Sequence, residues 1–295
     1  MPGYKSNNLF QVILELSKVR ITFAVAFTTL TGYVLAKGSI DAGVIIPVAG
    51  IFLLACGASA LNHLQERHYD AKMKRTRYRP LPAGKISVPG VIVVASIEII
   101  AGGLILVSGA GILPLVLGLI AMLWYNVVYT RLKRITVHAV IPGSVIGAIP
   151  PLVGWVSAGA SPLDINAIVL AFFFFIWQIP HFYLLAYKYG EDYKAAGFPS
   201  LFSRYSTFQV KRIIFYWITI TAVTSMFIPM IGLTKSYITL FAIGILSFRL
   251  VFQFIKPIIK PEMVYKPGKY FMKVNYYVLT IVLLLVFDRV LTDFF

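Results

Sequence analysis

The run AGVIIPVAGIFLLACGASAL, residues 42–61, decides the fold class, because it contains about twenty apolar or small residues and no charge. A helix of that length crosses the hydrocarbon core of a bilayer. The run passes without a break into the polar stretch NHLQERHYD, residues 62–70. The sequence therefore predicts a membrane-spanning helix whose end carries a group of polar side chains.

Apolar runs of this kind recur along the whole chain of 295 residues, of which 59% are hydrophobic and 13% charged. The mean hydropathy is +0.82. These values exclude a soluble domain and indicate an all-α polytopic membrane protein. The single Cys56 excludes an intramolecular disulfide. We expect one integral membrane domain over 1–295 with about nine helical spans, at 19–37, 42–62, 88–108, 111–130, 137–158, 165–187, 211–232, 236–255 and 273–291.

The distribution of Lys and Arg predicts the topology. If the N-terminus is cytoplasmic, every Lys and Arg lies on the cytoplasmic side except Lys37, Lys235, Arg249 and Arg289. The net charge of +16 is explained by the many cations on the cytoplasmic face, which serve as topology signals, so we expect no nucleic-acid partner. Residues 1–18 are expected to be cytoplasmic, with an interfacial helix around 9–14. We expect a multi-pass protein of the bacterial plasma (inner) membrane. The alternative that stays open is an organellar protein whose presequence has been removed.

Three oxygen-bearing side chains follow the first quoted run at helical spacing. Asn62, Glu66 and Asp70 lie at i, i+4 and i+8, which places them on one face of a helix in a column about 12 Å long. Amide and carboxylate oxygens suit a hard cation such as Mg²⁺. A cationic cluster follows at once, made of Lys72, Lys74, Arg75, Arg77 and Arg79. Together they favour a diphosphate held through Mg²⁺. Two simpler explanations stay open: a basic run next to a membrane helix is often a topology signal, and the acids can form charge pairs within the helix.

A second polar group follows the sixth span. Lys188 and Asp192 stand four residues apart just beyond its cytoplasmic end, as Glu66 and Asp70 do beyond the second span. Acids at matching ends of two spans are placed to share bridging Mg²⁺ ions around one diphosphate. His181 lies earlier in that span, where a lone His is more often a hydrogen-bonded core residue than a ligand. Glu98 lies near the middle of the third span and must face protein or water, with no partner evident from the sequence.

The fifth span has an unusual composition. Residues 142–155 combine small residues with adjacent prolines, Pro150 and Pro151. Small residues allow close helix approach, and prolines break a helix where it borders a cavity.

The pattern Asn62-x3-Glu66-x3-Asp70, with Asp192 as a second acidic site and nine spans, resembles the UbiA family of intramembrane prenyltransferases. Further blocks at 70–81, 129–136, 147–155 and 181–196 are similar to the branch of that family that farnesylates heme. The resemblance covers about 62–199. From about 211 onward the chain matches only as hydrophobic spans.

The resemblance implies a UbiA-like bundle with Mg²⁺ as cofactor and with farnesyl diphosphate and heme b as substrates. It implies catalytic and metal-binding roles for Asn62, Glu66, Asp70 and Asp192. The diphosphate contacts that it implies are Lys72, Arg75, Arg79, Lys133, Arg134 and Lys188. The prenyl or heme contacts are His63, Tyr125, Tyr129, Trp177 and His181, of which the two histidines are candidates for the heme iron. Heme A synthase or oxidase-assembly proteins are the implied protein partners.

Two positions depart from the family pattern. Glu66 stands where the family usually has Asp, and Lys188 stands where the wider family often has a second acid, which leaves the number of Mg²⁺ ions open. An aromatic acceptor such as a quinone precursor stays open as an alternative to heme. A transporter of an anionic metabolite is the alternative of another class, but a transporter would place its ionisable groups at mid-membrane and not at one face.

Overall fold

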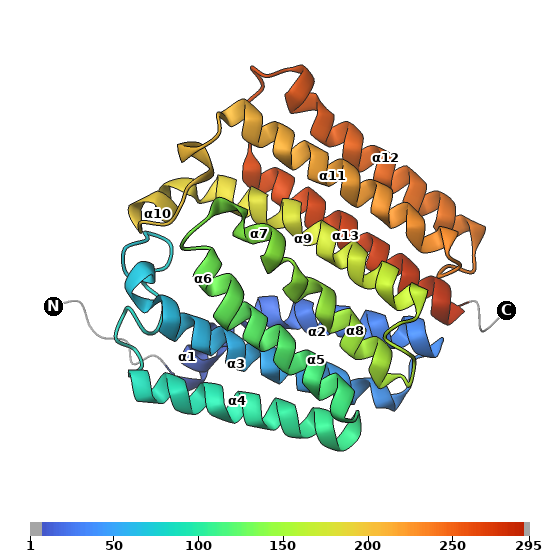
Figure 1. Ribbon diagram of the computed structural model, residues 1–295, viewed down its shortest axis with the longest axis horizontal. Coiled ribbons are helices and arrows are strands. Elements are labelled where there is room, and N and C mark those ends of the chain that lie inside the picture. Colours follow the sequence, from blue (N-terminus) through green and yellow to red (C-terminus); the bar gives the residue numbers. More distant parts are fainter. Residues whose placement is uncertain (1–7, 292–295) are drawn as a thin grey trace.

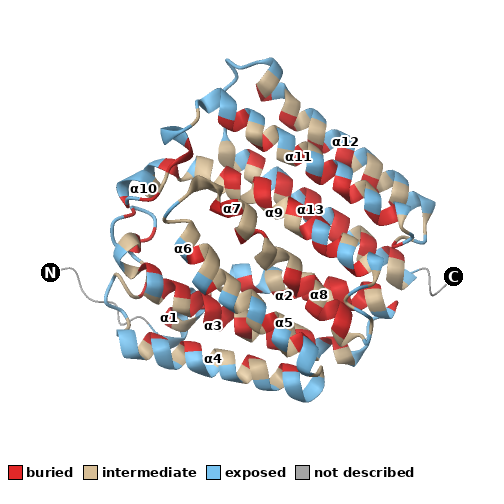
Figure 2. Ribbon diagram, in the orientation of Figure 1, coloured by how far each residue is buried: buried red, intermediate tan, exposed pale blue. Residues whose placement is uncertain are grey.

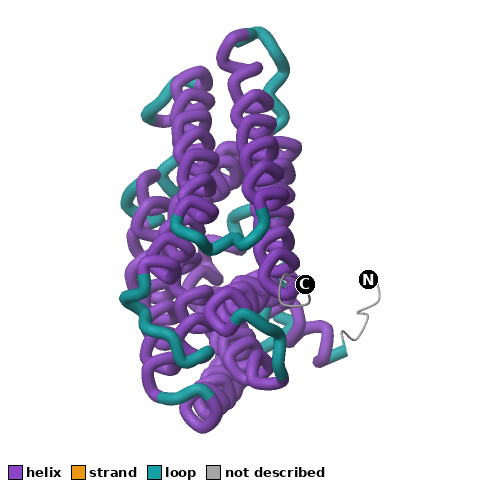
Figure 3. The backbone as a smooth tube through the Cα atoms, turned by 90° about the vertical axis from the view of Figure 1, so that its right-hand side faces the viewer, coloured by secondary structure: helices purple, strands orange, loops and turns teal. Residues whose placement is uncertain are grey.

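The structure is a computed structural model that describes residues 8–291. Figure 3 draws this part of the chain as helices joined by loops. Nine helical segments within it are long and apolar enough to cross a membrane, as expected from the sequence. Three shorter helices lie outside these spans: α1 (Leu9–Leu16), α10 (Gly190–Ala195) and η4 (Leu201–Ser203).

Six of the spans are single helices and three are built from consecutive segments. The single helices are α2 (Val19–Lys37), α4 (Val88–Gly109), α9 (Ile165–Lys188), α11 (Thr207–Met230), α12 (Tyr237–Ile259) and α13 (Pro267–Leu291). The composite spans are η1 (Ala42–Val44) with α3 (Ile45–Asp70); α5 (Ile112–Leu123) with η2 (Trp124–Tyr129) and α6 (Thr130–Leu132); and η3 (Val137–Ala139) with α7 (Val140–Gly143) and α8 (Val145–Ser157). Because α3 continues to Asp70, the predicted polar column does lie on a helix.

The helices lie side by side, with α4 at one edge of the view in Figure 1 and α12 at the opposite edge. The outer faces of these two helices are largely exposed (Figure 2). The exposed side chains there are apolar, among them Ile97 and Leu104 of α4 and Phe241 and Phe248 of α12. An apolar exterior is what a lipid environment requires of a helix bundle.

Two helices near the centre touch backbone to backbone. A Cβ atom added at Gly32 of α2 would lie 1.9 Å from the carbonyl oxygen of Pro151 in α8, and one added at Gly154 of α8 would lie 1.9 Å from that of Thr29 in α2. Only glycine fits at such positions, which confirms the close helix approach predicted for residues 142–155. The contact packs α8 against α2 at the end of the bundle opposite the polar end of α3.

The first described helix ends in a sharp corner. Val12 and Leu16 of α1 are buried in a cluster with Ala60 of α3 and with Val91 of α4. After this helix Lys18 adopts φ 46°, which makes it the one non-glycine residue with a positive φ among residues 8–291. This left-handed conformation turns the chain from α1 into α2 and is unfavourable for a side-chain-bearing residue.

The fourth span contains a π-helical turn, η2, between α5 and α6. Thr130 at its end donates a hydrogen bond from Oγ1 to the carbonyl oxygen of Tyr125, 2.9 Å away and five residues earlier. Asn126 is buried and donates from Nδ2 to the carbonyl oxygen of Ala58 on α3, 3.0 Å away. Single π-turns inside α-helices often mark functional sites, and this one lies directly against the polar end of α3.

The loop after α3 folds back onto the helix end. Met73 and Thr76 are buried, and Thr76 Oγ1 donates to the carbonyl oxygen of Asp70 at 2.9 Å. This fold returns Arg79 to the side chain of Asp70. That 1–295 form a single domain stays a prediction, and residues 1–7 of the expected N-terminal segment lie outside the described residues.

Candidate active site

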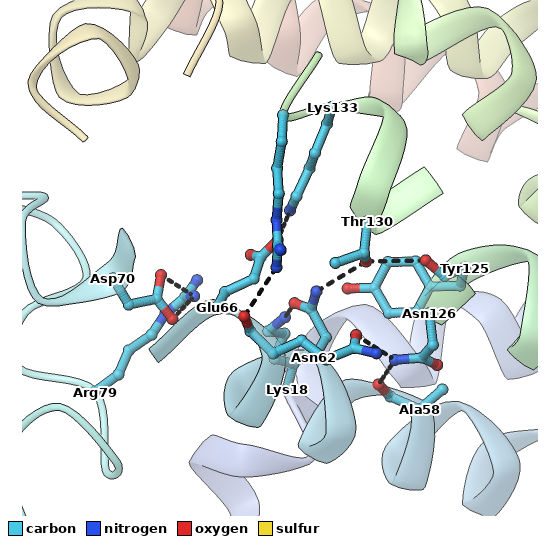
Figure 4. A network of polar contacts seen from close by, with 12 residues as sticks. Lys18, Ala58, Asn62, Glu66, Asp70, Arg79, Tyr125, Asn126, Thr130 and Lys133 are labelled. Carbon is cyan, nitrogen blue, oxygen red and sulfur yellow. Dashed lines mark hydrogen bonds and ion pairs between the residues drawn. The ribbon is translucent and has the colours of Figure 1, made fainter. Parts of the chain in front are cut away.

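The three members of the column, Asn62, Glu66 and Asp70, are buried, with exposed fractions of 1%, 4% and 0%. Buried carboxylates are unfavourable unless hydrogen-bonded or paired with a charge. Figure 4 shows that each of the three faces a positively charged side chain from a different part of the chain.

Asn62 lies at the deepest level of the column and bridges two other spans. Its Oδ1 accepts a hydrogen bond from Lys18 Nζ at 3.0 Å, and its Nδ2 donates to Thr130 Oγ1 at 3.2 Å. The donation to Thr130 depends on the π-turn, because that turn sets the direction in which the threonine points. Asn62 therefore ties α2, α3 and α6 together at the site.

The two carboxylates are ion-paired. Glu66 contacts Nζ of Lys133, the residue that directly follows α6. Both carboxylate oxygens of Asp70 accept hydrogen bonds from Arg79 Nη1, at 2.8 Å each. Lys133 also lies over the rings of Tyr129 and Phe198, at 5.5 Å and 5.9 Å from their centroids. A phosphate group entering this site would meet cations that are already oriented toward it.

From the sequence Lys18 is only a topology signal, and the structure adds it to the site. Burial and, to a smaller extent, the nearby guanidinium of Arg79 lower the pKa of Lys18 to about 7, although the carboxylate of Glu66 opposes the shift. The signal that identifies Lys18 is geometric: its left-handed backbone and its bond to Asn62. A single sequence shows neither.

The remaining predicted diphosphate residues lie farther out. Arg134 donates from Nη2 to the carbonyl oxygen of Gln65 at 2.9 Å. Arg75 is exposed, with its guanidinium 4.5 Å from the ring centroid of Tyr189, and exposed Lys188 approaches the same ring at 4.9 Å. Lys72 is exposed as well. Arg79 and Lys133 thus line the buried part of the site, whereas Arg75 and Lys188 meet at its rim.

Asp192 lies in α10, in the segment that covers the site. Phe198 of this segment packs against Tyr69 of α3, with ring centroids 4.7 Å apart, and Met73 joins the same cluster. Asp192 itself is half-buried. Among residues 8–291, however, no three His, Cys, Asp or Glu side chains gather closely enough to hold a metal, so Glu66, Asp70 and Asp192 do not form such a group here.

The predicted aromatic residues form a continuous row beside the column. Tyr125 stacks on Tyr129 and Tyr129 on Phe182, with centroids 6.1 Å and 5.6 Å apart. His181 meets the ring of Phe182 edge-on at 5.5 Å and that of Trp177 at 5.3 Å. The row therefore leads from the site into the bundle, which suits a prenyl chain and a developing carbocation.

The two predicted histidines differ in their surroundings. His181 Nδ1 lies 2.9 Å from Asn275 Oδ1 of α13, which is the hydrogen-bonded arrangement that is common for a histidine in a helical core. His63 is buried on α3, and neither of its ring nitrogens has a hydrogen-bond partner in the described part of the chain. The roles of both toward heme stay predictions.

The donor set of the column fits Mg²⁺ in its chemistry. An amide oxygen and two carboxylates on successive turns of one helix supply hard oxygen ligands from one side. Mg²⁺ commonly takes one or two protein carboxylates and completes its sphere with water and substrate phosphates. The column therefore offers part of a magnesium site that a bound diphosphate would complete.

Comparison with known proteins identifies the family. The model of the UbiA prenyltransferase family matches residues 25–261, which is most of the chain and includes the whole column. The chain belongs to the UbiA prenyltransferase family. This membership favours a transferase over the transporter alternative.

Curated UbiA relatives carry a more specific name. "Protoheme IX farnesyltransferase" of Cytophaga hutchinsonii is 36% identical over 249 residues, which cover 81% of this chain and 85% of the relative. The protein of the same name from Geobacter sulfurreducens is 40% identical over 186 residues, which cover 63% of this chain and 68% of the relative.

Solved UbiA structures share the fold. A digeranylgeranylglyceryl phosphate synthase matches with a TM-score of 0.76 at 15% identity, over 95% of this chain and 98% of that one. A UbiA homolog from Archaeoglobus fulgidus bound to GPP and Mg²⁺ matches with a TM-score of 0.68 at 12% identity, over 95% and 99%. The all-α UbiA-like bundle expected from the sequence is thereby confirmed.

Proposed function

We propose that this protein transfers the farnesyl group of farnesyl diphosphate to a vinyl group of heme b, with addition of water, and so produces heme O. The observation that carries the proposal is the buried column of Asn62, Glu66 and Asp70 with its three cations. It provides a diphosphate site in a chain whose relatives are named protoheme IX farnesyltransferase.

The column and its cations would bind and activate the diphosphate. Lys133 and Arg79 are already directed into the site, so they can exchange their carboxylate partners for phosphate oxygens when substrate arrives. Mg²⁺ bound by Asn62, Glu66 and Asp70, with Asp192 contributing from the covering segment, would neutralise charge on the leaving diphosphate. Arg75, Arg134, Lys72 and Lys188 would attract the anionic headgroup from the rim.

The aromatic row would accept the prenyl chain. When the carbon–oxygen bond breaks, the electron pair leaves with the diphosphate and an allylic cation remains. Tyr125 and Tyr129 are placed to stabilise that cation through their ring faces. The vinyl carbon of heme then forms the new carbon–carbon bond, and water adds to the resulting cation with loss of a proton. Heme is thus a substrate, for which His63 and His181 are candidate iron contacts.

The site lies at one end of the bundle, and the cations concentrate at that end. We infer from this asymmetry that the N-terminus and the site face the cytoplasm. We propose a bacterial plasma membrane as the location, because the two relatives described above are bacterial proteins. We expect heme A synthase or oxidase-assembly proteins to be the protein partners that receive the product.

The test is a product assay with protein purified in detergent, Mg²⁺, farnesyl diphosphate and reduced heme b. We expect mass spectrometry to find a heme that has gained one farnesyl group and one water. Asp70→Asn should abolish the product, whereas Glu191→Gln, which changes an exposed acid next to Asp192, should leave it unchanged.

The other outcomes refute parts of the proposal. A farnesylated aromatic acid in a parallel reaction, without a heme product, would keep the diphosphate site and replace the acceptor. Full turnover by Asp70→Asn would refute the proposed metal site.

A further inference from the structure

The carboxylate of Glu98 has a partner that the sequence does not reveal. Glu98 lies on α4, in the middle of an otherwise apolar span, and its Oε1 is 2.6 Å from Ser17 Oγ. Ser17 is also 2.8 Å from the carbonyl oxygen of Ile13 on α1. A carboxyl group at this depth is costly for a membrane protein, so its contact calls for a functional explanation.

Ser17 precedes the strained corner of the chain. The next residue, Lys18, has φ 46° and ψ 48°, and no side chain caps the start of α2 there. A lysine keeps a left-handed backbone only where its surroundings hold it in place. The contact with Glu98 fixes the residue immediately before this corner to α4, a helix that packs along α3.

The same corner directs Lys18 into the active site. Its Nζ reaches Asn62 Oδ1 at 3.0 Å, beside the other two cations of the column (Figure 4). A relaxed, right-handed backbone at Lys18 would point the side chain in another direction. The chain of contacts therefore runs from Glu98 through Ser17 to Lys18 and ends at Asn62.

We propose that Glu98 is a positioning residue that holds the Ser17–Lys18 corner and thereby places the Lys18 ammonium for binding the diphosphate of the prenyl substrate. This inference rests on the proposed function, because it assigns a support to the same site. It differs from a purely structural role in one consequence: the effect of Glu98 on substrate binding must pass through Lys18.

The experiment measures the dissociation constant of a non-hydrolysable farnesyl thiodiphosphate with Mg²⁺ and without heme, for the full chain in detergent. Glu98→Leu removes the hydrogen-bond partner of Ser17 on α4, and we expect the dissociation constant to rise about tenfold. Glu98→Gln keeps an amide that can accept a hydrogen bond from the Ser17 hydroxyl or donate one to it, so we expect the dissociation constant to stay within about twofold of the wild type.

A double-mutant cycle then separates positioning from folding. In a Lys18→Gln background, Glu98→Leu should cause no further loss of binding, because the group that it positions is gone. An equal loss in both backgrounds, or an unchanged dissociation constant in Glu98→Leu alone, would overturn the proposal. If Glu98→Leu does not fold, Ser17→Ala enters the cycle in its place with the same expectation.

These outcomes are separate from those of the heme assay. If wild-type protein binds the thiodiphosphate but makes no farnesylated heme, the proposed acceptor fails and the cycle still decides the role of Glu98. If heme is farnesylated and the cycle is additive, only the role of Glu98 fails.

Discussion

The ion pair of Asp70 and Arg79 offers the most direct test of the site's electrostatics. Arg79 Nη1 lies 2.8 Å from both carboxylate oxygens, and the exposed fractions of the two side chains are 19% for Arg79 and 0% for Asp70. Arg79→Met keeps an apolar stem of similar length and removes the guanidinium. It leaves the buried carboxylate of Asp70 without the guanidinium that neutralises it.

The expected cost follows from burial. Removing one partner of a buried ion pair typically lowers the free energy of unfolding by about 3–5 kcal/mol. Because Arg79 is partly exposed, we expect the lower end, about 3 kcal/mol. Asp70→Asn combined with Arg79→Met removes the uncompensated charge as well, so the double variant should recover most of this loss, to within about 1 kcal/mol of the wild type.

The assay is thermal and denaturant unfolding of purified protein in detergent, with and without Mg²⁺. Added Mg²⁺ should restore part of the stability of Arg79→Met, because it replaces the missing positive charge, and should not stabilise the double variant. Arg77→Met, which removes an exposed neighbouring cation, is the control and should stay within about 0.5 kcal/mol. Wild-type stability in Arg79→Met, or a double variant as unstable as the single one, would refute the reasoning.

Three further predictions concern packing and the ligand set. Gly32→Ala should lower the free energy of unfolding by about 1–3 kcal/mol or more, because its Cβ meets a backbone oxygen at 1.9 Å. Gly103→Ala is the control and should be tolerated, because its Cβ meets only a leucine methyl at 3.5 Å. Equal stability of the two variants would contradict the backbone contact. Asn62→Leu loses its bonds to two neighbouring spans and should reduce turnover about 100-fold in the product assay, a change of about 3 kcal/mol; turnover near wild type would remove Asn62 from the site. Asp192→Asn should leave the melting temperature unchanged and raise the Mg²⁺ concentration needed for half-maximal turnover about tenfold, and an unaltered Mg²⁺ dependence would argue that Asp192 is not a ligand.

Much of the fold could be predicted from the sequence because a bilayer imposes strict rules. The apolar run at 42–61 needs a helix to satisfy its backbone, and the same rule gave all nine spans. The column was predictable for a related reason. Residues four apart on a continuous helix share a face whatever the helix packs against, so Asn62, Glu66 and Asp70 needed no tertiary information.

The partners of the column were harder to predict, because they come from distant parts of the chain. Lys18 is 44 residues from Asn62, and Ser17 is 81 residues from Glu98. Nothing in a single sequence shows that a cation at the edge of a span turns inward through a left-handed corner. Thr130 was missed for another reason: its direction depends on a π-turn, which hydrophobic periodicity does not distinguish from an α-helical turn.

That π-turn also sets a constraint on sequence length. A π-turn contains one more residue than the α-helical turn it replaces. Loss of one residue within 124–129 would therefore let an α-helical turn replace the π-turn and would leave the helix after it in nearly the same direction. Loss of one residue from the α-helical part of the span would instead rotate everything after it by about 100° about the helix axis. Thr130 would then turn away from Asn62, and Lys133 away from Glu66, although neither had been changed. A single deletion in this span should therefore be tolerated best within the π-turn.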